Sequence, residues 1–268
     1  MDNLEKIISK FDLNDGELAY RYSSLPYGYY KEETYPIFCA TLDAVGDDIH
    51  VLDIGSGPGH LAFDFYQKRP SSKTRFSLMD SSYTFLRIAK ERIENLGFHI
   101  QVFHRNYNFL NWERDLGKYD VIVSNNSLFH LKPDLVAPFY EILFNLLNSN
   151  AVFLNQQAFS PILLKESFTT FYKIMGPEHY MSEKDKAQMP EIIEVLTDIE
   201  SDDKLKFSSE ISKLKSEGWK LDETPSYASL NLSEVQHLKF MNLAGFISAC
   251  IWRKMHFAVL VGLKGKPL

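Results

Sequence analysis

The stretch VLDIGSGPGHLA, residues 51–62, decides the fold. Apolar residues around Asp53 run into three glycines at alternate positions, Gly55, Gly57 and Gly59, and a second apolar stretch follows. Glycine allows tight turns and lets the backbone come close to another group without interference from a Cβ. A glycine-rich turn between a strand and a helix directs backbone N–H groups and the helix N-terminus at a ligand. We therefore expect a ligand site at this turn.

The glycine spacing argues against two common kinds of phosphate-binding site. The dinucleotide pattern G-x-G-x-x-G requires glycine or alanine where this chain has His60. A P-loop requires Gly-Lys followed by Ser or Thr, and the segment contains no such sequence. The pattern G-x-G-x-G preceded by Asp53 thus fits neither phosphate-binding pattern well.

Strand-like and helix-like segments alternate on both sides of this turn. We expect strands at 50–54, 74–80, 99–105, 119–125 and 151–159, and helices at 60–69, 81–97 and 134–147. Ser81 or Ser82 is the expected N-cap of the second helix, and Gly97 is its expected end. The strands are continuously apolar, which favours a parallel sheet covered on both faces.

The sequence on either side of this core predicts additional helices and strands. Helices are expected at 4–11 and 32–45, helical patterns without a strand over 161–217, and two final strands within 218–232 and 256–265 with a helical segment at 233–253 between them. The fold class is therefore α/β, with a doubly wound sheet.

Composition excludes several classes of protein. The net charge of −6 shows no general basic footprint, so nucleic-acid binding is not expected. The two cysteines, Cys39 and Cys250, are far apart and have no metal-ligand spacing, which favours a reduced, cytoplasmic protein without a metal site. No apolar run approaches the roughly 20 residues that span a bilayer, and no signal-peptide pattern is present at the start.

The glycine segment resembles motif I of the class I S-adenosylmethionine-dependent methyltransferases, E/D-x-G-x-G-x-G after the first strand. In "FSLMDSS", Asp80 stands where this family has the acidic residue that binds the ribose hydroxyls, and a carboxylate accepts two hydrogen bonds from a diol well. "FHRNYNFLNW" offers Asn106 for the adenine amino group, where the family usually has aspartate, with Tyr107 as a ring neighbour. "VIVSNNSLFHL" is similar to the family pattern that ends strand four, and His130 matches its tail.

The resemblance covers about residues 48–160 and implies a fold, a cofactor and a site. The fold is a mostly parallel seven-stranded sheet whose last strand is antiparallel. The cofactor is S-adenosylmethionine, with S-adenosylhomocysteine as product. The implied cofactor-binding residues are Asp53, Gly55, Ser56, Gly57, Gly59, Asp80, Ser81, Asn106, Tyr107 and Asn125.

Four parts of the chain then have predicted roles. Residues 1–47 form a helical N-terminal extension or lid, and 48–160 form the cofactor-binding core. Residues 161–217 form a helical insertion that covers the acceptor pocket, and 218–268 supply the strands that complete the core.

The acceptor is predicted by elimination. No Asn/Asp-Pro-Pro-Tyr sequence follows strand four, no Pro-Cys occurs, and Asn125 and Asn126 stand where metal-assisted catechol methylation would need carboxylates. A small molecule methylated on O or N remains, aromatic or apolar if the tyrosines of the two lid regions line its pocket. The tyrosines expected in that pocket are Tyr22, Tyr29, Tyr30 and Tyr172.

His130 is the best single candidate for a general base, because an imidazole accepts protons near neutral pH. A packing role behind the site is the alternative for this residue. For the whole protein, three alternatives stay open: cofactor binding without methyl transfer, methylation of RNA or protein, and a nicotinamide-dependent oxidoreductase, against which His60 argues. The chain is expected to act as a monomer or a homodimer.

Overall fold

A seven-stranded sheet forms the centre of the protein. The computed structural model describes residues 7–24, 31–109, 111–158, 208–222, 232–254 and 257–265. The strands of the sheet are β2 (His50–Ile54), β3 (Arg75–Asp80), β4 (Gln101–His104), β5 (Tyr119–Asn125), β6 (Leu147–Ala158), β8 (Ile247–Lys254) and β9 (Phe257–Lys264). Their order is β4-β3-β2-β5-β6-β9-β8. Strands β2 to β6 pair in parallel, and β9 is antiparallel to both β6 and β8, which confirms the predicted sheet with its antiparallel last strand.

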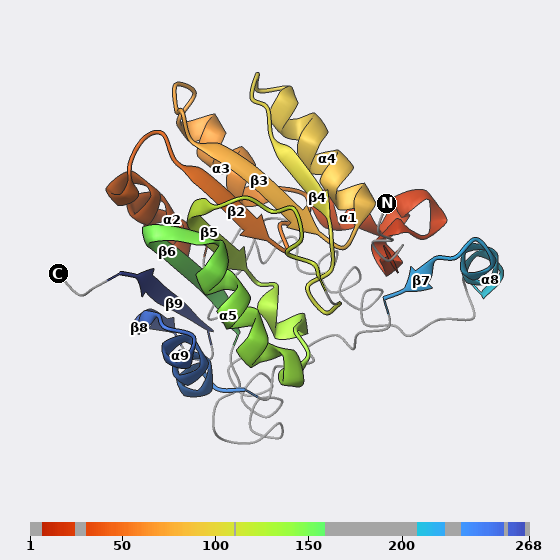
Figure 1. Ribbon diagram of the computed structural model, residues 1–268. Helices are drawn as coiled ribbons and strands as arrows, with labels where there is room; N and C mark the ends of the chain where they lie inside the picture. The colour runs from red at the N-terminus through yellow and green to blue at the C-terminus, as the bar shows by residue number, and fades with distance from the viewer. Residues whose placement is uncertain are drawn as a thin grey trace, which may run out of the picture.

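Helices cover both faces of this sheet (Figure 1). On one face lie α2 (Lys31–Val45), α3 (His60–Lys68) and α4 (Tyr83–Glu94), which share a hydrophobic cluster with the sheet. On the other face lie α5 (Val136–Leu146) and α9 (Glu234–Leu243), with a second cluster. The central strands are buried on both sides, which explains their continuous apolar sequences. None of the helices in the described ranges is long and apolar enough to cross a membrane.

The ends of α4 follow the predicted local chemistry. The Ser82 hydroxyl accepts a hydrogen bond from the Phe85 N–H and caps the start of the helix. At the other end Gly97 has a φ of 85°, its N–H donates to the Glu94 carbonyl, and the Phe98 N–H donates to the Ile93 carbonyl. These two bonds form the glycine-terminated Schellman motif.

The predicted N-terminal helix at 4–11 is wrong over its described residues. Residues Ile7–Ile8 form the short strand β1, and Lys10–Asp12 form a 3-10 helix, η1, that begins with a capping box between Ser9 and Asp12. A second 3-10 turn, η2 (Asn14–Gly16), leads into α1 (Glu17–Ser24). The apolar residues that suggested an amphipathic helix are used instead in a pairing with a distant strand.

That distant strand corrects a second prediction. Within 218–232 the structure describes only β7 (Lys220–Leu221), and it pairs in parallel with β1 in a separate two-stranded sheet (Figure 1). The helical segment expected at 233–253 ends at Leu243, and its second half is β8. A register shift between Cys250 and Trp252 interrupts the alternation of β8, which hid the strand in the sequence. Of the range 161–217, the structure describes α8 (Ser208–Ser216) and its following turn.

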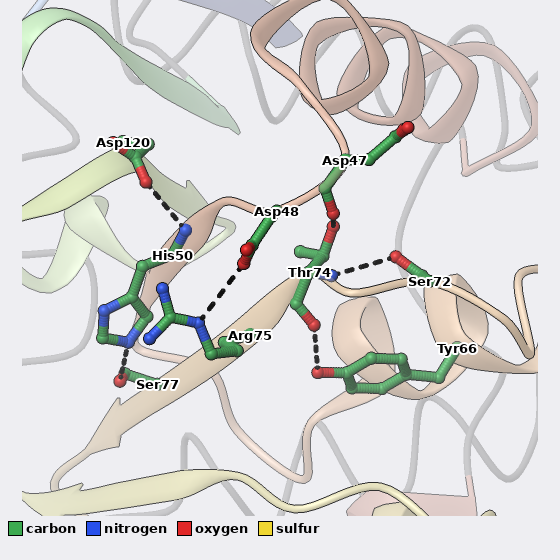
Figure 2. A network of polar contacts seen from close by, with 9 residues as sticks. All are labelled: Asp47, Asp48, His50, Tyr66, Ser72, Thr74, Arg75, Ser77 and Asp120. Carbon is green, nitrogen blue, oxygen red and sulfur yellow. Dashed lines mark hydrogen bonds and ion pairs between the residues drawn. The ribbon is translucent and has the colours of Figure 1, made fainter.

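A polar network holds the amino ends of β2 and β3 (Figure 2). The His50 N–H donates to the Asp120 carboxylate over 2.9 Å, and its ring nitrogen Nε2 lies 2.8 Å from the Ser77 hydroxyl. The buried Tyr66 hydroxyl donates to the Thr74 carbonyl over 2.9 Å. This network is at the opposite edge of the sheet from the glycine turn, so it takes no part in the site.

Candidate cofactor site

The glycine turn connects β2 to α3 at the carboxyl edge of the sheet. Gly55, Gly57 and Gly59 all have positive φ, at 67°, 53° and 72°. The N–H groups of Gly55 and Ser56 donate to the Met79 carbonyl of β3, over 2.7 and 3.1 Å. The turn is therefore tied to the neighbouring strand, at a position where ligands bind in open parallel sheets.

The three glycines serve different purposes. A Cβ on Gly55 would lie 1.7 Å from the Ser127 hydroxyl oxygen, and one on Gly59 would lie 2.7 Å from the Ala89 Cβ of α4. A Cβ on Gly57 would meet no atom within 4 Å. The first and third glycines thus permit close packing within the protein, whereas the middle one faces open space that a ligand can use.

We expect Gly57→Ala to weaken S-adenosylhomocysteine binding by about 10-fold or more, because the new methyl group occupies the open space. Its folding cost should be only the roughly 1–2 kcal/mol of a non-glycine residue in the left-handed region. Calorimetric titration and denaturant unfolding measure the two effects. Gly97→Ala is the matched control, since Gly97 also has positive φ and open surroundings. Equal binding by the two variants would contradict a ligand at Gly57.

Asp80 is held at the end of β3 by the glycine turn and by the start of α4. One carboxylate oxygen accepts the Gly57 N–H over 2.8 Å, and the other accepts the Ser82 N–H over 2.9 Å. The Ser81 N–H is a third backbone donor to this carboxylate, and the remaining lone-pair capacity can accept a hydrogen bond from a ligand. The fixed carboxylate therefore suits two adjacent hydroxyl groups such as those of a ribose.

Two acidic groups, Asp53 and Asp80, lie close to each other at this site. Asp53 is 2% exposed, and burial together with the charge of Asp80 raises its pKa to about 8. Burial raises the pKa of Asp80 to about 6, against the lowering effect of the Ser82 and Gly57 hydrogen bonds. Neither carboxylate forms an ion pair within the described part of the chain. Near pH 7 Asp80 is therefore mostly ionised and Asp53 mostly protonated, and a cation bound beside Asp53 would favour its ionised form. The site suits a ligand that carries hydroxyl groups and a positive charge.

The affinity for S-adenosylhomocysteine should depend on pH through both groups. The ribose hydroxyls of the ligand favour ionised Asp80, and a positive charge such as the ammonium group of S-adenosylhomocysteine favours ionised Asp53. The affinity should therefore be highest above pH 8 and fall as the pH decreases. In a plot of log Kd against pH we expect one bend near pH 8 and one near pH 6. Below each bend, the Kd should rise by up to about another 10-fold for every unit by which the pH falls. Asp53→Asn should remove the upper bend and Asp80→Asn the lower. A flat profile from pH 5 to 9 would contradict both assignments.

The turn after β4 brings Asn106 and Tyr107 to the same edge, but their polar groups contact protein. The Asn106 amide donates to the Asp222 carboxylate over 2.6 Å, and its oxygen accepts the Asn108 N–H. The Tyr107 hydroxyl donates to the Ser127 carbonyl over 2.7 Å. Direct contact of Asn106 with adenine stays a prediction, and Asp222 is the carboxylate that the structure places beside it.

His130 lies in η3 (Leu128–His130), directly after β5. The Asn108 amide donates to the His130 carbonyl over 3.0 Å, and the Lys132 N–H donates to the Asn108 oxygen. Burial, assisted by the positive charge of Lys10, lowers the pKa of His130 to about 4. The imidazole is therefore neutral at pH 7 and able to accept a proton, although such a low pKa makes it a weak base.

The other predicted site residues fall into three groups. Ser81 follows Asp80, its carbonyl accepting the His104 ring N–H, and Asn125 ends β5 opposite Gln156 of β6. Tyr22 packs against Phe11 and Phe85 over α4, so a contact with an acceptor stays a prediction. Tyr29, Tyr30 and Tyr172 lie outside the described residues. Within the described ranges, His, Cys, Asp and Glu side chains form no group of three or more that could hold a metal ion.

Sequence reasoning missed several residues that shape this site. They are Asp12, Ser127, Asn108 and Asp222. Ser9 and Asp12 have the spacing of a capping box, which predicts a local helical turn. The sequence carries no signal for the contacts of Ser127, Asn108 and Asp222, because each depends on how distant loops meet.

Comparison with known proteins agrees with this geometry. Residues 46–215 match the family described as "Methyltransferase domain". Among solved structures of similar fold is the magnesium protoporphyrin IX methyltransferase ChlM from Synechocystis PCC 6803 with bound S-adenosylhomocysteine, with a TM-score of 0.54, 15% identity and 95% of both chains covered. Another is the carbon methyltransferase CurJ, with a TM-score of 0.56, 14% identity and coverage of 92% of this chain and 58% of that one.

The S-adenosylmethionine-dependent methyltransferase SibL is similar over 88% of this chain and 56% of its own, with a TM-score of 0.52 and 13% identity. The chain thus spans little more than half the length of SibL and CurJ. No match is found among curated proteins.

Because the family match covers more than half of the chain, the protein belongs to the methyltransferase-domain family. Its cofactor is S-adenosylmethionine. The residues fit this group: the Asp80 carboxylate suits the ribose hydroxyls, Asp53 can ionise beside a positive charge, and Gly57 leaves space next to Asp80. When bound, the sulfonium supplies an activated methyl group.

Proposed function

We propose that the protein transfers the methyl group to an oxygen or nitrogen of a small molecule with an aromatic or apolar body. The observation that carries this proposal is the neutrality of the carboxyl ends of β5 and β6. Five residues with side-chain amides occur at these strand ends: Asn125, Asn126, Asn155, Gln156 and Gln157. Amides donate and accept hydrogen bonds without charge, which suits an uncharged acceptor.

The charge of the site argues against a nucleic-acid substrate. A phosphate backbone is bound through lysine and arginine side chains, whereas the Asp80 carboxylate is mostly ionised near pH 7 and the chain carries a net charge of −6. The match of ChlM to this chain over 95% of both lengths supports a small-molecule acceptor in addition. Reaction in the cytoplasm is part of the same proposal, in line with the free thiols of Cys39 and Cys250.

The chain's own contribution to the reaction is mainly alignment. An in-line displacement at a methyl group requires nucleophile, methyl and sulfur to be collinear in a site that excludes water. The Asn108 contacts hold η3, and with it His130, beside the end of β5. If the acceptor loses a proton, the neutral His130 imidazole is the proposed group to receive it.

The test is release of S-adenosylhomocysteine from S-adenosylmethionine with a panel of phenols, aromatic amines and N-heterocycles. Transfer to at least one member supports the proposal, and His130→Gln tests the base. Loss of kcat with an unchanged S-adenosylhomocysteine affinity supports proton transfer, whereas an unchanged kcat assigns His130 a packing role. Cofactor binding without any transfer, or transfer only to RNA or protein substrates, would overturn the proposal.

A further inference from the structure

The segment 7–24 reaches the cofactor edge of the sheet through one carboxylate. One oxygen of Asp12 accepts the Ser82 hydroxyl and the Thr84 N–H, both over 2.8 Å. The other oxygen accepts the Tyr83 N–H over 3.3 Å and the Ser9 N–H over 3.2 Å. A residue some 70 positions away in the sequence thus occupies the N-terminus of α4.

This contact completes the cap of α4. The first N–H groups of a helix have no partner within the helix, and a negative charge is favourable beside them. Ser82 alone satisfies the Phe85 N–H, and Asp12 satisfies those of Tyr83 and Thr84. The hydroxyl of Ser82 is therefore fixed from both sides.

Ser82 connects Asp12 to the predicted ribose-binding carboxylate. Its N–H donates to Asp80, while its hydroxyl donates to Asp12. The two carboxylates are thus held by the same serine, one through the backbone and one through the side chain. Displacement of Asp12 would free the Ser82 hydroxyl and the first turn of α4, and with them one of the bonds that orient Asp80.

Apolar and backbone contacts keep the segment in this place. The Phe11 and Tyr22 rings lie 4.5 and 5.4 Å from the Phe85 ring of α4. A Cβ on Gly16 would lie 2.5 Å from the Thr84 methyl group, so the backbone passes very close to the helix. Figure 1 shows the segment beside the start of α4.

A second attachment lies at the turn after β4. Strand β1 pairs with β7, and the Asp222 N–H donates to the Ile8 carbonyl over 2.9 Å. The Asp222 carboxylate accepts the Asn106 amide over 2.6 Å. The segment is therefore attached at both turns, after β3 and after β4, that the cofactor assignment places around ribose and adenine.

We infer that Asp12 is a positioning residue for the cofactor site: it docks residues 9–24 onto α4 and, through Ser82, sets the orientation of Asp80. The inference rests on the assignment of Asp80 to the ribose hydroxyls. It adds a residue of the N-terminal segment to the machinery that binds the cofactor.

The charge of Asp12 affects the pH at which Asp80 ionises, an effect that a purely structural contact would lack. The acidic and hydroxyl groups whose electrostatics are linked to Asp80 are Asp12, Asp53, Tyr22 and Tyr107, and its hydrogen-bond donors are the N–H groups of Gly57, Ser81 and Ser82. The negative charge of Asp12 raises the pKa of Asp80. Asp12→Asn keeps an oxygen acceptor for the two short bonds from Ser82 and Thr84, with its NH2 group toward the longer contacts of Ser9 and Tyr83. It removes the charge, so ionisation of Asp80 should move to lower pH.

The experiment is calorimetric titration of S-adenosylhomocysteine from pH 5 to 9 on wild type, Asp12→Ala and Asp12→Asn. We expect Asp12→Ala to bind about 10-fold or more weakly, with faster hydrogen exchange at the start of α4. The Kd of Asp12→Asn should stay within about 3-fold of the wild-type Kd at pH 8. The lower bend of its log Kd profile should occur at a lower pH than in wild type. The control is Asp43→Ala, which removes the ion pair between Asp43 of α2 and Arg69 at the end of α3 and should leave both the affinity and the bends unchanged.

Two results would overturn the inference. If wild type binds and both Asp12 variants keep its Kd and its lower bend, Asp12 contributes only to folding, and the cofactor assignment stands. If Asp12→Ala does not fold, the lower bend of the Asp12→Asn profile is the test: a bend at the wild-type pH overturns the inference. Failure of wild type to bind S-adenosylhomocysteine would remove the cofactor assignment and this inference with it.

Discussion

Replacement of Gly55 by alanine is expected to lower the free energy of unfolding by about 2–5 kcal/mol. Two costs add. A non-glycine residue in the left-handed region costs about 1–2 kcal/mol, and forcing a methyl group into a packed site typically costs about 1–3 kcal/mol. The new Cβ would lie 2.4 Å from the Ser127 Cβ, an atom that no rotation of the serine side chain can move away. The segment around Ser127 must therefore shift.

The shift should also reach the site. The Ser127 carbonyl accepts both the Tyr107 hydroxyl and the His130 N–H, so its displacement disturbs the turn after β4 and η3 together. We expect Gly55→Ala to weaken S-adenosylhomocysteine binding even at temperatures where the variant is folded. Denaturant unfolding and calorimetry measure the two effects. Gly97→Ala separates backbone strain from the clash, and a Gly55→Ala variant as stable as Gly97→Ala would show that the Ser127 segment yields at no cost.

The parts of the fold that the sequence predicts well are those in which local pattern and tertiary role coincide. β2 and β5 are buried on both faces, so their apolar residues coincide with the strands, and both boundaries match the prediction. The glycine turn is predicted for a related reason: positive φ at alternate positions is a backbone requirement visible at the residue level.

The errors arise where a segment is defined by a distant partner. Ile7 and Ile8 look like part of an amphipathic helix, but their strand exists only through pairing with Lys220 and Leu221. β8 is an edge strand whose register shift at Cys250 breaks the alternation by which strands are recognised.

The same limit applies to the site. Asp80 is found from its place after β3, whereas Asp12 and Asp222 act across some 70 and 116 positions of sequence. Asn106 shows the consequence: its position in the sequence suggests a free amide for adenine, and the structure engages both ends of that amide with Asp222 and Asn108.

Asp80→Ala is expected to weaken S-adenosylhomocysteine binding by about 100-fold or more at pH 8. A hydrogen bond to a charged group contributes about 1.5–3 kcal/mol, and two ribose hydroxyls would lose theirs. Asp80→Asn should bind almost as poorly. Both carboxylate oxygens accept backbone N–H groups, from Gly57 and Ser82, so one of these donors would face the amide NH2 group of asparagine.

The stability of the same variants distinguishes binding from folding. Because the folded-state pKa of Asp80 is raised to about 6, its ionisation opposes folding: the stability it contributes is present at low pH and is lost as the pH rises through 6. Removal of the carboxylate should therefore cost little stability at pH 8, despite the N–H groups of Gly57, Ser81 and Ser82 that lose their acceptor. Asp120→Ala is the matched control, since Asp120 also accepts two hydrogen bonds, from the His50 N–H and the Asn148 amide, but at the opposite edge of the sheet. It should lower the unfolding midpoint and leave the Kd unchanged, whereas an Asp80→Ala variant that loses stability but retains affinity would refute the ribose contact.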